Sequence, residues 1–410
     1  MTAYSYAFTQ DNIDRWDAHD IAEIHRVIED VFEKKEGLLP SSKEALILIK
    51  PNLNNDLNAL TGNSTDLRLL ATLLTCFQER GYTNLVVADG PNIGINRKPI
   101  DVFVRLGVRA LTERYSVQLV NLNHEPSLAV DLTTSKARIA NVCLKADFFI
   151  NVAKIKTHAE VGMSCCLKNL IGCVVGQDKK RVHDNLAANI VRLNEIIRPD
   201  LHIVDGLVAM EGNGPGDGEP RRLDLILAGR DPFLIDLLVA HLVGLNRQEI
   251  EYLGIAKEKG YLSPGDIEKV ARLEQLVQLE KPPPRNPLAG ILEHSLLEGI
   301  RDLTRPLHGR EEVRALLYRA GILQDLYQLG DAKIDKIYLN MEECDDCGRC
   351  LHFCPLALPI TEPGFGFTAD RCLGCLYCAH VCPRQAIIYK GDFGYLARHL
   401  ARYGDQMRRL

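Results

Sequence analysis

Eight cysteines near the C-terminal end of the sequence follow one repeated spacing. CDDCGRCLHFCP runs from Cys344 to Pro355, and CLGCLYCAHVCP runs from Cys372 to Pro383. Each run reads C-x2-C-x2-C-x3-C-P, and the second repeats the first 28 residues later. A [4Fe-4S] cube needs four thiolates directed at one centre, and a tight loop with a cysteine at every third residue supplies three of them. The spacing therefore predicts iron–sulfur ligation.

The fourth cysteine of each run precedes a proline and is expected to turn away and bind the cluster of the other run. Two [4Fe-4S] clusters are predicted, with the ligand sets Cys344, Cys347, Cys350, Cys382 and Cys372, Cys375, Cys378, Cys354. A pair of zinc sites is the alternative, but zinc prefers two separated C-x2-C pairs. Residues 336–390 resemble the bacterial two-cluster ferredoxins, with short β-rich pieces flanking both runs. The resemblance implies a small α+β fold and low-potential one-electron transfer.

Length and composition limit the class of protein. A chain of 410 residues predicts two or three domains, and 46% hydrophobic with 25% charged residues predicts packed cores. A net charge of −5 gives no support for nucleic-acid binding. No apolar run reaches the length of a membrane span, and the N-terminal residues lack a secretion signal. Thirteen cysteines in such a chain favour metal binding or catalysis in a reducing cytoplasm.

Upstream of the cysteine runs, apolar strands alternate with helices. This pattern predicts an α/β fold with a mostly parallel sheet covered by helices on both faces. Strands are predicted at 44–50, 84–90, 147–158 (leaving the strand near Lys154), 201–206 and 223–229, and helices at 65–81 (capped by Thr65 or Ser64), 99–111 and 232–244.

Domain boundaries follow from changes in this pattern. Residues 1–280 are predicted to form the α/β domain. KPPPRNP then interrupts regular structure and opens a helical connector at 281–335. The ferredoxin-like domain occupies 336–390, and 391–410 form a basic amphipathic helix. Such a tail is more often a packing helix than a contact for an acidic partner.

Polar residues stand where the predicted strands end. Ligands of open parallel sheets bind beyond the carboxyl ends of the strands, so these residues are expected to share one site. They are Lys50, Asn52, Asp89, Lys154, Lys156, His158, Asp205, Arg230 and Asp231.

The densest polar stretch is 151–184. Lys168 and Asn169 fall on the helix that follows the third strand, close to Lys154 and Lys156. Several ammonium groups around one pocket favour an anionic small-molecule substrate. His158 or His183 would supply protons, because histidine titrates near neutral pH. Lys156 is a further catalytic candidate.

The glycine-rich stretch 212–218 follows the fourth strand. It matches neither G-x-G-x-x-G nor a P-loop, and a flexible lid over the pocket is the expectation. Glu211 at its base is a candidate proton donor, although a surface carboxylate is the commoner outcome.

Three cysteines in the same region need separate treatment. Cys165, Cys166 and Cys173, with His158 and His183, are able to form a third metal site. The alternative is that they belong to the core, since free cysteine buries readily and adjacent cysteines rarely bind one metal comfortably.

Residues 46–267 resemble the DUF362 proteins (domain of unknown function 362), which are often fused to a ferredoxin module. The motifs that carry the resemblance are IKPN, KIKTH, LKNLIG, VDGLVAMEGNGPGDG, and DP followed by Asp236. The resemblance implies an α/β domain with an unassigned, redox-linked activity. It supplies no catalytic residues.

These observations predict an iron–sulfur oxidoreductase. Electrons from a redox partner, such as a ferredoxin, a flavodoxin or a reductase, would pass through the two clusters to an anionic substrate in the α/β domain. One alternative is a ferredoxin-type carrier or assembly partner without substrate chemistry of its own. Another is a binding module whose clusters only sense redox state.

Overall fold

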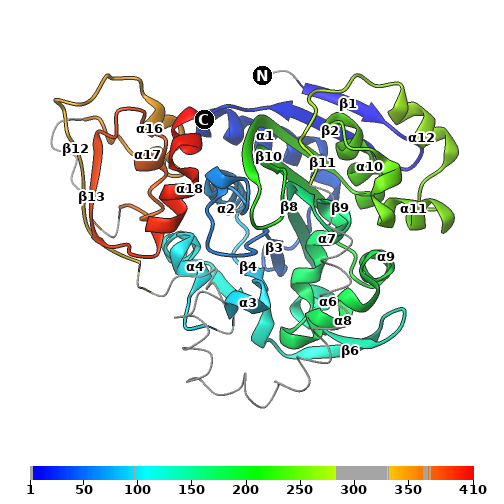
Figure 1. Ribbon diagram of the computed structural model, residues 1–410. Helices are drawn as coiled ribbons and strands as arrows, with labels where there is room; N and C mark the ends of the chain where they lie inside the picture. The colour runs from blue at the N-terminus through cyan, green and yellow to red at the C-terminus, as the bar shows by residue number, and fades with distance from the viewer. Residues whose placement is uncertain (1–2, 97, 283–329, 331, 363–367, 369–370) are drawn as a thin grey trace, which may run out of the picture.

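The computed structural model describes residues 3–96, 98–282, 330, 332–362, 368 and 371–410, and its main feature is a nine-stranded sheet (Figure 1). The strand order is β1-β2-β11-β10-β8-β3-β4-β5, and β9 pairs with β8. The strands are β1 Ala3–Ala7, β2 Asn12–Asp17, β3 Ile47–Lys50, β4 Leu85–Asp89, β5 Gln118–Asn121, β8 Phe148–His158, β9 Gly162–Ser164, β10 Leu201–Glu211 and β11 Glu219–Gly229.

The central part of this sheet is parallel. Strands β10, β8, β3, β4 and β5 run in the same direction, and both faces of the sheet are covered. The apolar residues of β3 alternate between the two cores, with Leu48 on one side and Ile47 and Ile49 on the other. This explains why these strands read as unbroken apolar runs, and the predicted α/β fold class is confirmed.

Helices cover both faces of the sheet. The core on one face contains α1 and α2, and the core on the other contains α9 and α10. The α/β part of the chain has α1 Ile21–Lys34, α2 Leu67–Glu79, α3 Ile93–Asn96, α4 Val102–Arg105, α5 Val108–Arg114, α6 Val142–Lys145, α7 Cys166–Asn169, α8 Lys179–Val182, α9 Leu186–Ile196, α10 Pro232–Leu242, α11 Glu251–Glu258 and α12 Pro264–Ala271. A separate hairpin joins β6 Ser127–Asp131 to β7 Lys136–Ala140.

Several predicted elements need correction. Strand β8 does not end near Lys154, because β9 pairs with its last residues and extends it to His158. Helix α2 is capped by Asp66, whose carboxylate accepts a hydrogen bond from the Arg68 backbone N–H at 2.9 Å. The single helix predicted at 99–111 is divided into α4 and α5 at Gly107, which has φ +75°.

Strand β11 is antiparallel to β10, which changes the expected site. The carboxyl end of an antiparallel neighbour lies at the opposite edge of the sheet. Arg230 and Asp231, which follow β11, line a different depression together with His202. These two residues are therefore removed from the predicted group at the strand ends.

The C-terminal part is small and mixed. Strand β12 (Lys333–Leu339) pairs antiparallel with β13 (Ile387–Asp392), and the short helices α16 (Arg349–His352) and α17 (Tyr377–His380) lie between them in the sequence. The connector predicted at 281–335 lies almost entirely outside the described residues. Within the described part of the chain, no helix is both long and apolar enough to cross a membrane.

The tail forms α18 (Leu396–Arg409), as the sequence predicts, and it packs on the α/β part of the chain (Figure 1). Tyr403 and Met407 belong to the same core as α1 and α2. Arg402 forms an ion pair with Glu219 of β11 at 3.0 Å. The tail is thus a packing helix that joins the two parts of the molecule.

Candidate functional site

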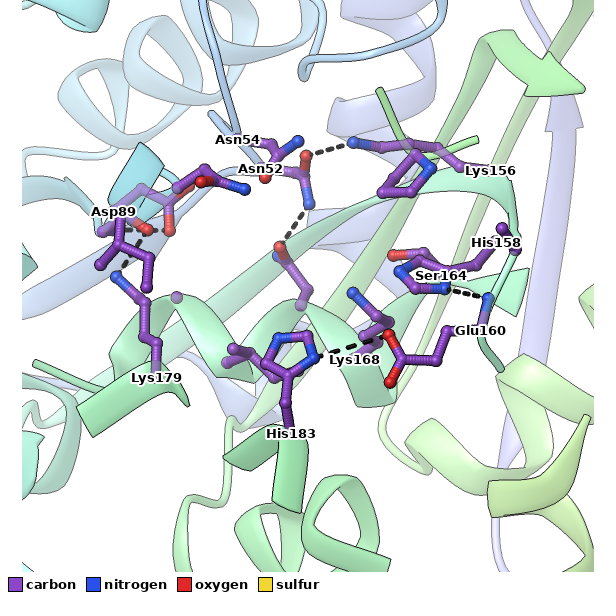
Figure 2. A pocket seen from close by; sticks show the side chains of 18 residues that line it. Asn52, Asn54, Asp89, Lys156, His158, Glu160, Ser164, Lys168, Lys179 and His183 are labelled. Carbon is purple, nitrogen blue, oxygen red and sulfur yellow. Dashed lines mark hydrogen bonds and ion pairs between the residues drawn. The ribbon is translucent and has the colours of Figure 1, made fainter. Parts of the chain in front are cut away.

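A cavity of about 330 Å³ lies beyond the carboxyl ends of β3 and β4 and beside the end of β8 (Figure 2). Its polar lining residues are Asn52, Asn54, Asp89, Asn92, Lys156, His158, Glu160, Ser164, Lys168, Asn169, Lys179 and His183. Seven of these were predicted from the sequence: Asn52, Asp89, Lys156, His158, Lys168, Asn169 and His183. Parallel strands bring their ends to one edge, which is why residues distant in sequence meet here.

Two asparagines form the frame of the cavity. Lys156 donates a hydrogen bond to Asn52 Oδ1 at 2.7 Å, and Asn52 Nδ2 donates to Asn169 Oδ1 at 2.9 Å (Figure 2). Asn169 Nδ2 in turn donates to Asn151 Oδ1 at 2.7 Å. Because each amide is held at both ends, the orientation of the Lys156 ammonium group is set before any ligand arrives.

A buried ion pair lies beneath one wall. Lys50 is fully buried, and its Nζ lies 2.8 Å from Asp89 Oδ1. The other Asp89 oxygen accepts a hydrogen bond from the Leu53 N–H at 2.6 Å. Lys50 itself does not line the cavity, so its charge neutralises Asp89 and is not presented directly to a ligand.

Lys156 and Lys168 bring two amino groups with lowered pKa values to the cavity. Burial lowers the pKa of Lys156 well below its ordinary value, and the positive charges of Lys168 and Lys154 lower it further. Burial also lowers the pKa of Lys168 to about 8. Within the described residues the Lys168 ammonium group has no hydrogen-bond partner. A bound anion would relieve both effects by restoring a counter-charge.

Lys179 was not predicted. It begins α8, and its ammonium group donates to Gly90 O at 2.9 Å, to Pro91 O at 3.4 Å and to Asn123 Oδ1. Burial lowers the pKa of Lys179 to about 7, although the nearby Asp89 raises it. Its three oxygen partners indicate that Lys179 holds the loops after β4 and β5 next to α8. The sequence did not predict this contact, because two adjacent lysines at the start of a helix are usually exposed to solvent.

The two predicted histidines lie at the same side of the cavity as Glu160 (Figure 2). His158 Nδ1 accepts hydrogen bonds from the Glu160 and Val161 N–H groups at 3.1 and 3.4 Å. A neutral His158 ring therefore carries its hydrogen on Nε2. His183 Nδ1 lies 3.6 Å from Glu160 Oε2, so a protonated His183 has a carboxylate beside it.

Besides Lys50, three predicted site residues do not reach the cavity. Lys154 and Asp205 form a fully buried ion pair at 3.0 Å between β8 and β10. Both lie inside their strands, whereas the prediction placed them at strand ends. Glu211 accepts a hydrogen bond from the Glu280 N–H at 3.0 Å and fixes the segment that follows α12. The structure assigns these residues to the support of the site.

Cys165 and Cys166 lie beside a buried carboxylate. Their sulfurs and an Asp236 oxygen are within 4.8 Å of one another, and all three residues are buried. Asp236 accepts hydrogen bonds from the Cys166 and Leu167 N–H groups at 2.8 and 3.2 Å, which fixes the start of α7. Cys173 lies against Cys143 instead. The structure does not bring His158 or His183 into this group.

The two cysteine runs have the same local geometry. Asp346 and Gly374 occupy equivalent places and both have positive φ, as do Gly348 and Leu376. The Asp346 and Gly374 N–H groups each donate to the first cysteine of their run at 3.4 Å. The Leu358 and Ala386 N–H groups donate in the same way to Cys354 and Cys382, at 3.4 and 3.2 Å. The repeated spacing therefore reflects a repeated backbone.

The structure brings several of the cysteines of the two runs together. Cys354, Cys372, Cys375 and Cys378 line one common cavity. Cys350 interacts electrostatically with the other three cysteines, Cys344, Cys347 and Cys382. Burial raises the pKa of Cys350 to about 11 and that of Cys375 well above its ordinary value. Thiolates at such places need a cation nearby, and four sulfurs on one cavity fit a [4Fe-4S] cluster.

This combination of a parallel α/β sheet, a strand-end cavity and a C-terminal cysteine-rich unit defines an α/β protein fused to an iron–sulfur module. Residues 47–241 match the family described as "Domain of unknown function (DUF362)". Residues 366–388 match the family described as "4Fe-4S binding domain".

The chain is 30% identical over 231 residues to the thylakoid-associated protein sll1697 of Synechocystis. This alignment covers 53% of the chain and 68% of that protein. The chain therefore belongs to the DUF362 family and carries a 4Fe-4S binding domain. A solved structure of the lactate racemase apoprotein from Thermoanaerobacterium thermosaccharolyticum aligns with a TM-score of 0.31 and 10% identity. It covers 52% of this chain, and the chain spans about half, 53%, of that protein.

Proposed function

We propose that the chain is an iron–sulfur oxidoreductase that delivers low-potential electrons to an anionic small molecule in the strand-end cavity. Two [4Fe-4S] clusters, held by Cys344, Cys347, Cys350, Cys382 and by Cys354, Cys372, Cys375, Cys378, would supply single electrons. One observation carries the proposal. A cavity lined by lysines and histidines belongs to the same folded unit as the cysteine loops, because Phe353 and Tyr377 of those loops share one hydrophobic core with β3 and β4, the strands whose ends form the cavity.

The roles of the cavity residues follow from their charges and contacts. Lys156 and Lys168 bind the negative charge of the substrate, while Asn52 and Asn169 hold Lys156 in place. Reduction of an unsaturated centre consumes protons, and His158 and His183 are positioned to supply them. Glu160 lies beside His183, with its Oε2 at 3.6 Å from Nδ1.

The first experiment is purification without oxygen, followed by counts of iron and sulfide, spectra during stepwise reduction, and extraction of bound small molecules. About eight irons per chain are expected for two clusters, together with an anionic compound that binds tightly or changes the spectra. Eight irons with a cavity that binds no anion would favour an electron carrier without substrate chemistry. Two zinc ions per chain would contradict the cluster assignment.

A further inference from the structure

The two groups of cysteines have different surroundings. Phe353, Leu373 and Tyr377, which are neighbours of Cys354, Cys372 and Cys378, belong to the hydrophobic core that contains α2. By contrast, Cys347 of the other group is exposed. The group of Cys354, Cys372, Cys375 and Cys378 is therefore the inner one, and the group of Cys344, Cys347, Cys350 and Cys382 is the outer one.

Tyr377 lies where the inner group packs against the α/β part of the chain. It stands between Cys375 and Cys378 in the sequence, and only 1% of its surface is exposed. Its hydroxyl oxygen accepts a hydrogen bond from the backbone N–H of Leu67, the first residue of α2, at 3.4 Å.

The backbone from Leu67 leads directly to the cavity. Two residues earlier, Thr65 Oγ1 accepts a hydrogen bond from the Asn52 N–H at 2.8 Å, and the Thr65 N–H donates to Asn52 O at 2.9 Å. Asn52 lines the cavity and accepts the hydrogen bond from Lys156. The path from Tyr377 to the cavity wall thus consists of covalent bonds and hydrogen bonds only.

Two other contacts between the cysteine loops and the α/β part involve residues that do not line the cavity. Asn58 Nδ2 lies 3.1 Å from His380 Nδ1, and the Arg68 guanidinium stands 4.4 Å from the centre of the Phe353 ring. Neither Asn58 nor Arg68 is among the residues that line the cavity. Arg68 forms an ion pair with Asp66, whose N–H donates to Asp205, and Asp205 pairs with the buried Lys154.

We infer that Tyr377, with the backbone of residues 65–67, is the electronic link between the inner cysteine group and the cavity wall at Asn52. This inference rests on the proposed function. In each transfer, one electron supplied by a reduced one-electron carrier leaves the inner cluster for the acceptor in the cavity. No bond of the link is made or broken, and Tyr377 is not itself oxidised.

The test places an artificial acceptor at the cavity. Asn54 lines the cavity, and the five cysteines outside the two runs are all buried, so Asn54→Cys offers a selective site for a ruthenium bipyridyl label. The full chain, loaded with iron–sulfur clusters, is reduced with dithionite and desalted. A light flash with a sacrificial oxidant removes one electron from the label. The rate at which the label regains an electron from the reduced chain is followed by transient absorbance.

Tyr377→Phe, which keeps the ring and removes the hydroxyl, is expected to slow this transfer severalfold. Thr65→Val, which is distant from the cysteines, is expected to slow it as well. Tyr389→Phe is the matched control, because Tyr389 lies on β13 and packs against Phe393 within the C-terminal part. Iron content, circular dichroism and cluster potentials are measured for each variant.

Equal rates in the Tyr377→Phe and Tyr389→Phe proteins, with equal iron content, would overturn the link. If Tyr377→Phe fails to bind iron, the Thr65→Val rate decides the question. The assay uses no natural substrate. Failure to find an anionic compound would therefore count against the proposed function alone, and an unchanged rate would count against the link alone.

Discussion

At the scale of single residues, the positive charge of the cavity depends on lysines whose ammonium form is costly to bury. Lys168 is the clearest case, because burial lowers its pKa to about 8 and the described residues give its ammonium group no hydrogen-bond partner. Below pH 8 the ammonium form predominates and attracts an anion, and above pH 8 the neutral amine does not. Anion binding at the proposed site would therefore depend on pH.

The affinity for a compound released from the purified protein should fall as the pH rises from 7 to 9. Lys168→Arg should keep the affinity nearly constant over this range, because a guanidinium stays charged. Lys168→Met should weaken binding at every pH. Calorimetric titrations at several pH values provide the measurement, with Lys257→Met on the exposed face of α11 as a control. A wild-type affinity that is independent of pH would rule out this role for Lys168.

Gly172 tests the packing behind the cavity wall. A Cβ atom at this position would overlap the Asp89 carboxylate and lie 2.7 Å from Lys50 Nζ. Gly172→Ala should therefore displace the Lys50–Asp89 pair, lower the free energy of unfolding by about 1–3 kcal/mol, and weaken anion binding. Gly216→Ala, where a Cβ would meet nothing within 4 Å, should change neither quantity. Urea denaturation without oxygen would show the difference, and equal stability of the two variants would contradict it.

At the scale of helices and strands, the sequence predicted the parts of the site that depend on parallel strand ends. The apolar runs that form β3, β4, β8 and β10 were recognisable, and polar residues at the ends of β3, β4 and β8 meet at one edge. Strand direction was not recognisable in β11, because an antiparallel strand that is buried at one end has the same apolar run. This is why Arg230 and Asp231 were misplaced.

Residues inside long strands were also misjudged. Period two places Lys154 and Lys156 on the same side of β8, but only Lys156 lies close enough to the strand end to reach the cavity. The partner of Lys154 is Asp205 on β10, and such a pairing depends on the register between two strands. A single sequence does not carry that register.

The Lys154–Asp205 pair gives a prediction at this scale. Lys154→Met leaves the Asp205 carboxylate buried without its counter-charge and should lower the free energy of unfolding by about 3–5 kcal/mol. Adding Asp205→Asn removes that charge but keeps only one oxygen, which accepts from either the Asp66 or the Leu207 N–H group, so the double variant should recover part of the loss. Urea denaturation of the single and double variants measures the coupling. A double variant less stable than Lys154→Met would show that the pair is not a compensated charge pair.

At the scale of the whole molecule, the iron–sulfur part and the α/β part share one core. Phe353, Tyr377 and Met407 pack with residues of α2, and Tyr377 contacts the first N–H of that helix. Removal of iron with a chelator and an oxidant should therefore loosen the start of α2 as well as the cysteine loops. Hydrogen exchange of the Leu67 amide should quicken in the iron-free protein, while that of β4 should stay slow. Unchanged exchange at Leu67 would mean that the two parts are independent.

The surroundings of the outer cysteine group favour one kind of redox partner. The loop around the exposed Cys347 carries four exposed acidic residues, Glu342, Glu343, Asp345 and Asp346. A partner with a basic face would be guided to this loop, and salt would weaken the attraction. Ferredoxins and flavodoxins that are themselves acidic would be repelled, so a carrier or reductase with a lysine-rich face fits better.

Cytochrome c, a basic one-electron acceptor, is a suitable probe. Its second-order rate of reduction by the reduced chain should fall steeply between low and physiological salt, because exposed charges are screened over about 8–10 Å. Glu342→Gln with Glu343→Gln should lower the rate at low salt and flatten its salt dependence. Glu258→Gln with Glu268→Gln, on α11 and α12 at the opposite side of the molecule (Figure 1), removes the same charge and should leave the rate unchanged. If both double variants react alike, the net charge of the chain and not the acidic loop steers the partner, and electrons enter by another face.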